Sequence, residues 1–248
     1  MTRTTDEQAA SDVATAAGVL LLEHRKTLGD AGLDPAQFKN AADQLSHEFI
    51  VAELARRFPG DAVLSEEGAD DTARLSADRV WIVDPLDGTR EYGEAGRSDW
   101  AVHVALVEKG SLTVGAVAMP ALGVTYSSAD GDGGHSSATP VRVVVSRTRR
   151  PEPVMRMADS MDAQLIEMGS AGAKAMAVVC GDADVYAHAG GQYEWDSAAP
   201  VAVARAAGLH VSRIDGSELR YNQENPWLPD LLICRPELAA TALEELGR

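Results

Sequence analysis

Two aspartates stand three residues apart at the point where a short apolar segment ends. Residues 80–83 are apolar and mostly β-branched or aromatic, so they predict a buried strand. Asp84 and Asp87 follow in the run Asp-Pro-Leu-Asp-Gly-Thr, where Pro85 prevents the strand from simply continuing and Gly88 lets the backbone turn sharply. Both carboxylates can then converge with a freed backbone carbonyl on one point, an oxygen-rich site that suits Mg2+. The simpler alternative is a strand end followed by an Asp-capped turn.

Further acids occur at two other predicted element boundaries. Residues 63–67, Val-Leu-Ser-Glu-Glu, predict a short strand that ends in Glu66 and Glu67, and Asp196 stands just before a predicted helix of small residues. Two carboxylates about 5 Å apart repel by roughly 3 kcal/mol at an effective dielectric constant near 20. Several such pairs would rival the net stability of a domain, so a gathered cluster requires bound cations or retained protons. Two or three Mg2+ ions satisfy this requirement best.

The three acidic segments together resemble the signatures of the inositol monophosphatase superfamily, which are Mg2+-dependent, lithium-sensitive phosphatases. Its pattern is Glu-Glu, then Asp-Pro-x-Asp-Gly-Thr, then Trp-Asp-x-Ala-Ala, and all three stand here in that order. The match is most similar to the CysQ-type branch, which removes the 3'-phosphate from 3'-phosphoadenosine 5'-phosphate. Three features carry this finer resemblance: Leu-Ser-Glu-Glu, the run Arg90-Glu91-Tyr92, and Gly169 to Lys174. The resemblance implies a layered αβαβα sandwich, of class α+β or α/β.

The resemblance also implies metal ligands and catalytic groups. One Mg2+ is expected on Glu67, Asp84 and the Leu86 carbonyl, and a second on Asp84, Asp87 and Asp196. How Glu66 and Glu67 divide direct and water-mediated ligation stays open. The expected catalytic residues are Glu66, Glu67, Asp87 and Thr89, with Thr89 paired to one of the two glutamates so that it orients the attacking water.

Asp43 and the phosphate-binding amides complete this implied centre. Asp43, in the run Asn-Ala-Ala-Asp, is expected to support the metals from outside or to form a weak third metal site. The alternative is a first-turn carboxylate that the helix dipole favours. The backbone amides of Gly88 and Thr89 are expected to bind the phosphate, next to Leu86, Asp87 and Asp196.

Other predicted substrate contacts each have a simpler alternative. Gly169, Ser170 and Ala171 could line the sugar pocket or only join a strand to a helix. Lys174 could bind a second phosphate or be a solvated helix lysine, and Glu194 could bind a hydroxyl group or be an exposed acid. Arg90, Arg97 and Arg220 are expected to be ordinary surface residues. None of the six histidines has partners at metal-ligand spacing, so none is proposed as a ligand.

Composition limits the class of protein and its partners. The chain has 248 residues, 45% hydrophobic and 24% charged, which suits one large domain or two halves at 1–139 and 140–248. The formal charge of −16 argues against nucleic acid and anionic membranes as partners. Both cysteines, Cys180 and Cys234, stand in apolar runs and are expected to be buried, reduced thiols. No apolar signal segment is recognised, and we expect a cytoplasmic homodimer.

The remaining pattern predicts alternating strands and helices, so the second half reads as α/β. Strands are expected at 61–65, 80–83, 100–107, 112–119, 124–127, 141–146, 164–168, 183–188, 209–212 and 231–234. Helices are expected at 6–28, 41–57, 151–162, 173–181, 197–208 and 237–246, with loops at 29–37, 90–99 and 128–140. Asp130-Gly-Asp132-Gly resembles the start of a calcium loop but lacks the acid at its twelfth position, Val141, so a hairpin loop is expected instead.

The favoured function is a Mg2+-dependent 3'(2'),5'-bisphosphate nucleotidase that serves sulfate assimilation, with 3'-phosphoadenylyl sulfate as a second candidate substrate. An inositol-1-phosphatase or a fructose-1,6-bisphosphatase of the same fold is the alternative within the family. A catalytically silent metal or ligand sensor is the alternative from another class. The complete set of acids together with Thr89 argues against a sensor, which would not need a residue that orients water.

Overall fold

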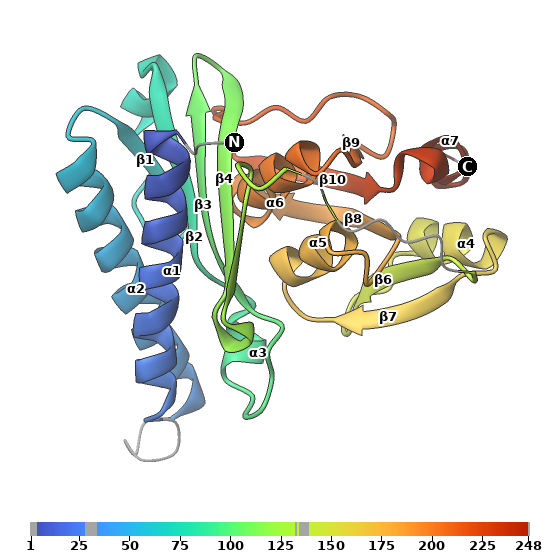
Figure 1. Ribbon diagram of the computed structural model, residues 1–248, viewed down its shortest axis with the longest axis horizontal. Helices are drawn as coiled ribbons and strands as arrows, with labels where there is room; N and C mark the ends of the chain where they lie inside the picture. Colours follow the sequence, from blue (N-terminus) through green and yellow to red (C-terminus); the bar gives the residue numbers. More distant parts are fainter. Residues whose placement is uncertain (1–3, 28–33, 132, 134–138, 248) are drawn as a thin grey trace.

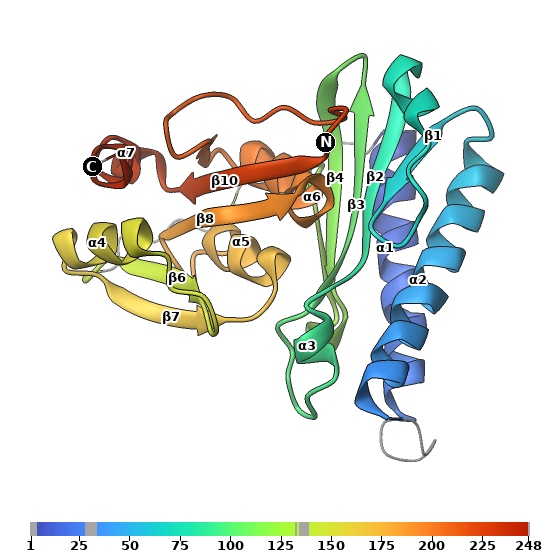
Figure 2. The same ribbon diagram turned by 180° about the vertical axis from the view of Figure 1, so that it is seen from behind.

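Two five-stranded sheets alternate with three layers of helices in this protein (Figures 1 and 2). The computed structural model describes residues 4–27, 34–131, 133 and 139–247. Helices α1 and α2 cover one face of the first sheet, α5 and α6 lie between the sheets, and α4 and α7 cover the far face of the second. The predicted αβαβα sandwich is therefore confirmed.

The first sheet has the order β1-β2-β3-β4-β5, in which only β1 and β2 are parallel. Its strands are β1 (Ala62–Ser65), β2 (Arg79–Asp87), β3 (Ala101–Glu108), β4 (Ser111–Met119) and β5 (Val124–Ser127). Between them lie the short helices η1 (Thr72–Ser76), α3 (Thr89–Tyr92) and η2 (Pro120–Leu122). The turn at 108–110 forms the expected hairpin, since Glu108 pairs with Ser111.

The apolar run at 80–83 is continuous because β2 is buried on both faces. Val80 and Ile82 point into the core between the two sheets. Trp81 and Val83 point to the opposite face and pack beneath α1 and α2. This strand is thereby fixed in the middle of the molecule, and its end at Asp87 has a fixed position.

Helix α2 (Pro35–Arg57) begins earlier than the sequence pattern predicts. The Asp34 side chain accepts hydrogen bonds from the amides of Ala36 and Gln37, and Pro35 occupies the first turn, where its missing N–H costs nothing. The expected loop at 29–37 is therefore wrong at its C-terminal end. Asp43 consequently lies in the helix interior, and its alternative role as a first-turn carboxylate is wrong as well. Helix α1 (Thr5–Arg25) packs beside α2.

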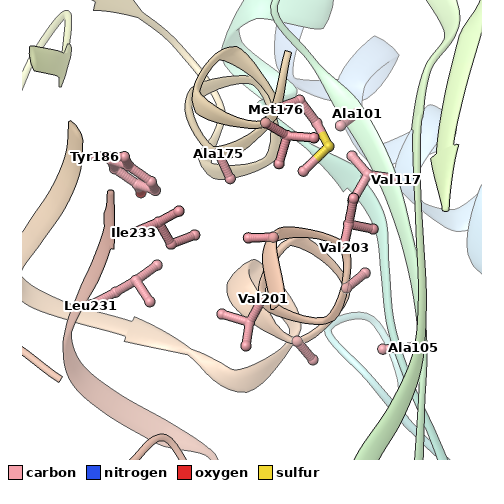
Figure 3. Packing of buried hydrophobic residues seen from close by; sticks show 14 of the residues in the cluster. Ala101, Ala105, Val117, Ala175, Met176, Tyr186, Val201, Val203, Leu231 and Ile233 are labelled. Atoms are coloured by element: carbon pink, nitrogen blue, oxygen red, sulfur yellow. The ribbon is translucent and has the colours of Figure 1, made fainter. Parts of the chain in front are cut away.

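The middle layer consists of α5 (Ala171–Val179) and α6 (Glu194–Ala206), whose small residues allow close packing. Figure 3 shows Met176, Val201 and Val203 of these helices between Val117 of the first sheet and Ile233 of the second. Helix α6 begins three residues earlier than predicted, so Asp196 belongs to its first turn and does not precede the helix.

The second sheet has the order β7-β6-β8-β10-β9. Its strands are β6 (Arg142–Ser146), β7 (Gln164–Met168), β8 (Val185–Tyr193), β9 (His210–Ser212) and β10 (Trp227–Cys234). The outer layer contains α4 (Glu152–Ser160), η3 (Pro236–Leu238) and α7 (Ala239–Leu246). Strand β8 continues five residues beyond its predicted end, because its antiparallel partner β10 also starts early.

The stretch at 128–140 links strands of different sheets, so the expected hairpin loop is wrong. Asp132, part of the rejected calcium-loop pattern, lies outside the described residues. A division into domains 1–139 and 140–248 stays a prediction. Both cysteines are free as expected, but Cys180 is exposed and only Cys234 is buried. Among the described residues, no helix is long and apolar enough to span a membrane.

Gly115 on β4 supplies a test of the central packing. A Cβ atom there would lie 2.6 Å from the Ala199 carbonyl oxygen and 2.6 Å from the Ala202 Cβ, both on α6. We expect Gly115→Ala to lower the free energy of unfolding by about 1–3 kcal/mol, measured by urea denaturation, because the core has no room for a methyl group. Gly60→Ala is the matched control, since no atom lies within 4 Å of its added Cβ. Equal stability of the two variants would contradict this packing.

Candidate metal and phosphate site

The site forms where the end of β2 meets the first turns of α5 and α6. The pairing of β2 with β3 is irregular between Asp84 and Asp87, so Pro85 and Leu86 form a bulge. The Leu86 amide donates to Asp84 Oδ1 (3.1 Å), and the Ser46 hydroxyl of α2 donates to the Pro85 carbonyl (2.7 Å). These bonds hold the turn so that both aspartates point to the same side.

Gly88 ends this bulge in a conformation that other residues rarely adopt. Its φ of 87° lies in the left-handed region, and an added Cβ would lie 2.8 Å from the Ser170 Cβ. The glycine therefore allows both the turn into α3 and the close approach of the 170 segment. This close contact brings the turn that carries Asp84 and Asp87 next to the start of α5.

Three carboxylates gather at this point. Asp84, Asp87 and Asp196 each offer an oxygen atom within 4.8 Å of the other two, and Asp84 and Asp87 are buried. Asp196 reaches the group from the first turn of α6, where its other role is to accept the Tyr193 amide at 2.6 Å. The donor set is oxygen-rich and anionic, which fits Mg2+.

The remaining acids surround this group. Partial desolvation and the neighbouring carboxylate of Asp196 raise the pKa of Glu66 to about 7, although its side chain keeps access to solvent. Burial and then the charge of Glu67 raise the pKa of Asp43 to about 7. Burial and Asp87 raise the pKa of Asp196 to about 6, and burial with Glu66 raises the pKa of Asp84 well above its usual range. The cluster therefore holds protons or cations near neutral pH.

Asp87 behaves differently because it is hydrogen-bonded on both oxygens. The amides of Ala171 and Gly172 donate to its Oδ1 and Oδ2 at 3.1 and 2.6 Å, so Asp87 caps the N-terminus of α5. His103 Nε2 lies 3.2 Å from Oδ2. Burial alone would raise the pKa of Asp87, but the His103 imidazole and the Gly172 amide lower it. Asp87 is therefore the acid that stays ionised.

Thr89 does not pair with either glutamate as expected. Its hydroxyl lies 3.5 Å from Asp43 Oδ1 and donates to the Leu86 carbonyl at 3.2 Å. The carboxylate beside Thr89 therefore comes from α2, and the expected pairing with Glu66 or Glu67 is wrong in this structure. The Leu86 carbonyl also lies within the turn that the sequence predicts to bind metal.

A cavity of about 480 Å³ opens beside the carboxylates. Nine of the predicted residues line it: Glu66, Asp87, Gly88, Thr89, Gly169, Ser170, Ala171, Lys174 and Asp196. Arg90 also lines it, although we expected an ordinary surface residue. Arg97 pairs with Asp99, and Arg220 is exposed elsewhere. Asp43, Glu67, Asp84 and Leu86 do not line the cavity, and Asp84 lies buried beneath its wall.

Glu194 is not a substrate contact in this structure. Its side chain is fully buried, and its carboxylate accepts the amides of Asn222 (2.6 Å) and Gln223 (2.8 Å). Both expectations for Glu194, a hydroxyl ligand and an exposed acid, are therefore wrong. The residue instead anchors the 222–223 loop to the start of α6.

Lys174 lines the cavity but is not a solvated lysine. Only 5% of its surface is exposed, and Nζ donates to the carbonyls of Gly169 and Ser170. The ammonium also lies 5.4 Å from the centre of the Tyr186 ring. Burial lowers the pKa of Lys174, and the nearby charge of Asp87 opposes this change. The ammonium lies at the wall of the cavity and braces the 169–170 turn.

Several residues of the cavity wall were not predicted from the sequence. Arg147 and Arg149 follow β6, and Tyr193 and Trp227 come from the ends of β8 and β10. The basic run Arg147-Thr-Arg149-Arg150 in a chain of charge −16 was a usable signal. No local sequence pattern predicts that the aromatic residues line the same cavity.

Comparisons with known proteins agree on one family. The profile described as "Inositol monophosphatase family" matches residues 3–246. A "3'-phosphoadenosine 5'-phosphate phosphatase" of Mycobacterium leprae (strain TN) is 49% identical over 252 residues, covering 96% of this chain and 92% of that protein. A "3'(2'),5'-bisphosphate nucleotidase CysQ" of Escherichia coli (strain K12) is 33% identical, covering 76% and 81%. The crystal structure of CysQ from Bacteroides thetaiotaomicron matches with TM-score 0.80 at 30% identity, covering 93% and 97%.

The acid cluster predicts an unusual dependence of stability on pH. Because Glu66, Asp43 and Asp196 have raised pKa values when folded, the folded state holds protons that the unfolded chain releases. In chelator, we expect the free energy of unfolding to fall by at least ~2 kcal/mol between about pH 4.5 and pH 8. Urea denaturation measures this change, and saturating Mg2+ should reverse most of it.

Asp196→Asn is the matched variant, because it removes one charge and keeps an oxygen that can accept the Tyr193 amide. In chelator near pH 8, it should be at least as stable as the wild type and should gain much less stability from Mg2+. A wild-type free energy of unfolding that changes neither with pH in this range nor with Mg2+ would contradict the predicted metal cluster.

Proposed function

Because the chain belongs to the inositol monophosphatase family, we propose that it is a Mg2+-dependent phosphatase that removes the 3'-phosphate of 3'-phosphoadenosine 5'-phosphate. The observation that carries this proposal is the composition of one cavity. Carboxylates for metals, cations for a second phosphate and aromatic rings for a base all line it. The names of relatives at 49% and 33% identity support the same substrate.

The carboxylates are proposed to hold two or three Mg2+ ions. Asp84, Asp87 and Asp196 provide the converging oxygens, and Glu66 and Glu67 with the Leu86 carbonyl complete the set. Bound Mg2+ supplies a nucleophilic water of lowered pKa and stabilises the leaving oxygen. The buried, mutually repelling carboxylates fit this role because cations offset the repulsion that the fold otherwise bears.

Thr89 and Asp43 are proposed to orient the attacking water and receive its proton. The Thr89 hydroxyl lies between Asp43 Oδ1 and the Leu86 carbonyl, so its direction is fixed by its partners. A carboxylate whose pKa is about 7 is matched to proton transfer near neutral pH. The amides of Gly88 and Thr89 are proposed to hold the scissile phosphate in the same turn.

A second phosphate is proposed to bind the basic wall on the other side of the cavity. Arg147 forms ion pairs with Glu91 and Glu94, so its charge is already partly used. Arg149 is exposed, lines the cavity and forms no ion pair among the described residues. Lys174 adds an ammonium group to the guanidinium of Arg149, partly engaged by backbone carbonyls. Two cations at the cavity that the carboxylates also line suit a bisphosphate better than a monophosphate.

Aromatic side chains favour a nucleotide over an inositol or a sugar. The rings of Tyr193 and Trp195 are stacked, with centroids 4.7 Å apart and planes 7° apart. Trp227 is 46% exposed at the same cavity. Base–aromatic stacking contributes about 1–3 kcal/mol per base, whereas inositol and fructose have no planar face to stack. Sulfate assimilation, the homodimer and the cytoplasmic location stay predictions alongside this proposal.

A substrate panel tests the proposed function. We expect the wild type to hydrolyse 3'-phosphoadenosine 5'-phosphate with a higher kcat/KM than inositol-1-phosphate, fructose-1,6-bisphosphate and adenosine 3'-phosphate, and to lose activity in excess chelator. Phosphate release measures all four rates. A preference for inositol-1-phosphate would overturn the nucleotidase proposal, and turnover of none would favour the sensor alternative.

Arg149→Ala tests the basic wall. If Arg149 binds the second phosphate, the charged contact of roughly 1.5–3 kcal/mol is lost, so kcat/KM for the bisphosphate should fall about tenfold to a hundredfold. Adenosine 3'-phosphate, which lacks that phosphate, should be affected much less. Arg150→Ala is the matched control because Arg150 pairs with Glu167 and does not line the cavity. Equal losses on both substrates would remove Arg149 from the proposal.

A further inference from the structure

His103 is a fully buried histidine on β3 to which the sequence analysis assigned no role. Its Nδ1 lies 3.0 Å from the Trp195 carbonyl oxygen in the first turn of α6. Its Nε2 lies 3.2 Å from Asp87 Oδ2. Among the described residues, Nε2 forms no hydrogen bond of good geometry, although it lies within ion-pair distance of Asp87. The imidazole therefore stands between two segments that carry proposed metal ligands.

The Trp195 contact fixes the orientation of the ring. A carbonyl oxygen only accepts hydrogen bonds, so Nδ1 must carry the hydrogen. The ring edge that bears Nε2 is then directed at Asp87 Oδ2, and it attracts this carboxylate when Nε2 carries a hydrogen as well. This carboxylate also accepts the amides of Ala171 and Gly172, so three elements converge on one side chain.

The position of Asp87 depends on contacts outside its own strand. Asp87 follows a bulge in β2, where the ladder to β3 is irregular and fixes the side chain less firmly. Asp196 follows Trp195 directly in α6. A histidine that contacts both Asp87 and the Trp195 carbonyl thus sets the distance between two carboxylates that share a cation. Mg2+ demands near-ideal octahedral geometry, so this distance matters for binding.

The imidazole packs closely against the backbone of α5 at Gly172. A Cβ atom at Gly172 would lie 2.2 Å from His103 Nε2 and 3.1 Å from Asp87 Oδ2. Only a glycine at this position of α5 lets the imidazole, the carboxylate and the helix backbone meet. A histidine that only filled space in the core would not require this close contact between the backbone of α5 and the imidazole. The polar edge of such a histidine would face no ionised group.

We propose that His103 is a positioning residue for the metal site, which holds Asp87 and the first turn of α6 in the arrangement that binds Mg2+. It does not ligate the metal, and the carboxylates do so. The proposal rests on the metal site of the proposed function but not on the identity of the substrate.

Two variants separate the two contacts of the ring. His103→Asn places an amide near the former Nδ1, so it can keep the bond to the Trp195 carbonyl but does not reach Asp87. His103→Gln places an amide near the former Nε2, so it can donate to Asp87. Val117→Ala is the matched packing control, since Val117 pairs with His103 in the sheet and is buried in the hydrophobic core.

Isothermal titration with Mg2+ in the absence of substrate, well below each melting temperature, gives the readout. We expect His103→Asn to bind Mg2+ about tenfold to a hundredfold more weakly, as is typical for partners that orient metal ligands. His103→Gln should recover most of the affinity, and Val117→Ala should bind as the wild type does despite its lower stability.

Equal Mg2+ affinity in wild type and His103→Asn would overturn the positioning role. The positioning role would also be overturned if His103→Gln lost as much Mg2+ affinity as His103→Asn. It would be overturned as well if Val117→Ala lost Mg2+ affinity in proportion to its loss of stability. These outcomes are independent of the substrate panel, because no substrate is present. A wild type that binds no Mg2+ would instead overturn the metal premise of the proposed function, and this inference with it.

Discussion

The repulsion among buried carboxylates at the end of β2 is the constraint on which the rest of the site depends. Asp84 is almost completely buried, and Asp87 and Asp196 present oxygens within 4.8 Å of it and of each other. The fold opposes this repulsion with the first-turn amides of α5, which donate to Asp87, and with the Tyr193 amide just before α6, which donates to Asp196. The His103 imidazole and the Gly172 amide lower the pKa of Asp87 despite its burial, whereas burial and the charge of Glu66 raise the pKa of Asp84 well above its usual range.

Much of this arrangement could be predicted from local sequence, because its cause is local. A strand buried on both faces has to read as a continuous apolar run, and residues 80–83 do. The proline and glycine that follow can only be accommodated in a turn. Asp84 and Asp87 stand in one motif at the end of this strand, and Asp196 was joined to them through the resemblance of its own motif to a family signature. The start of α2 was missed since the residues of its cap, Asp34 and Pro35, also suit a loop.

Contacts between distant segments could not be predicted. Thr89 meets Asp43 across 46 residues and Arg147 meets Glu91 across 56, and neither pair has a periodic signature. Glu194 looked like a substrate ligand because it adjoins Trp195 and Asp196. Glu194 and Asp196 are two residues apart, and two residues along a helix turn the side chain by about 200°. Its carboxylate consequently lies against the 222–223 loop, on a different side from Asp196.

Asp87 connects the carboxylate cluster to the part of the cavity that is proposed to bind substrate. Its carboxylate caps α5, and the residues just before and within that helix, from Gly169 to Lys174, line the cavity where a substrate would sit. A shift of Asp87 on cation binding would therefore move the amides of Ala171 and Gly172 with it. The turn that follows β7 cannot relax independently, because Gly88 and Gly172 already pack at contact distance against Ser170 and His103. The proposed cation binding and substrate alignment would in this way both depend on one junction between the two sheets.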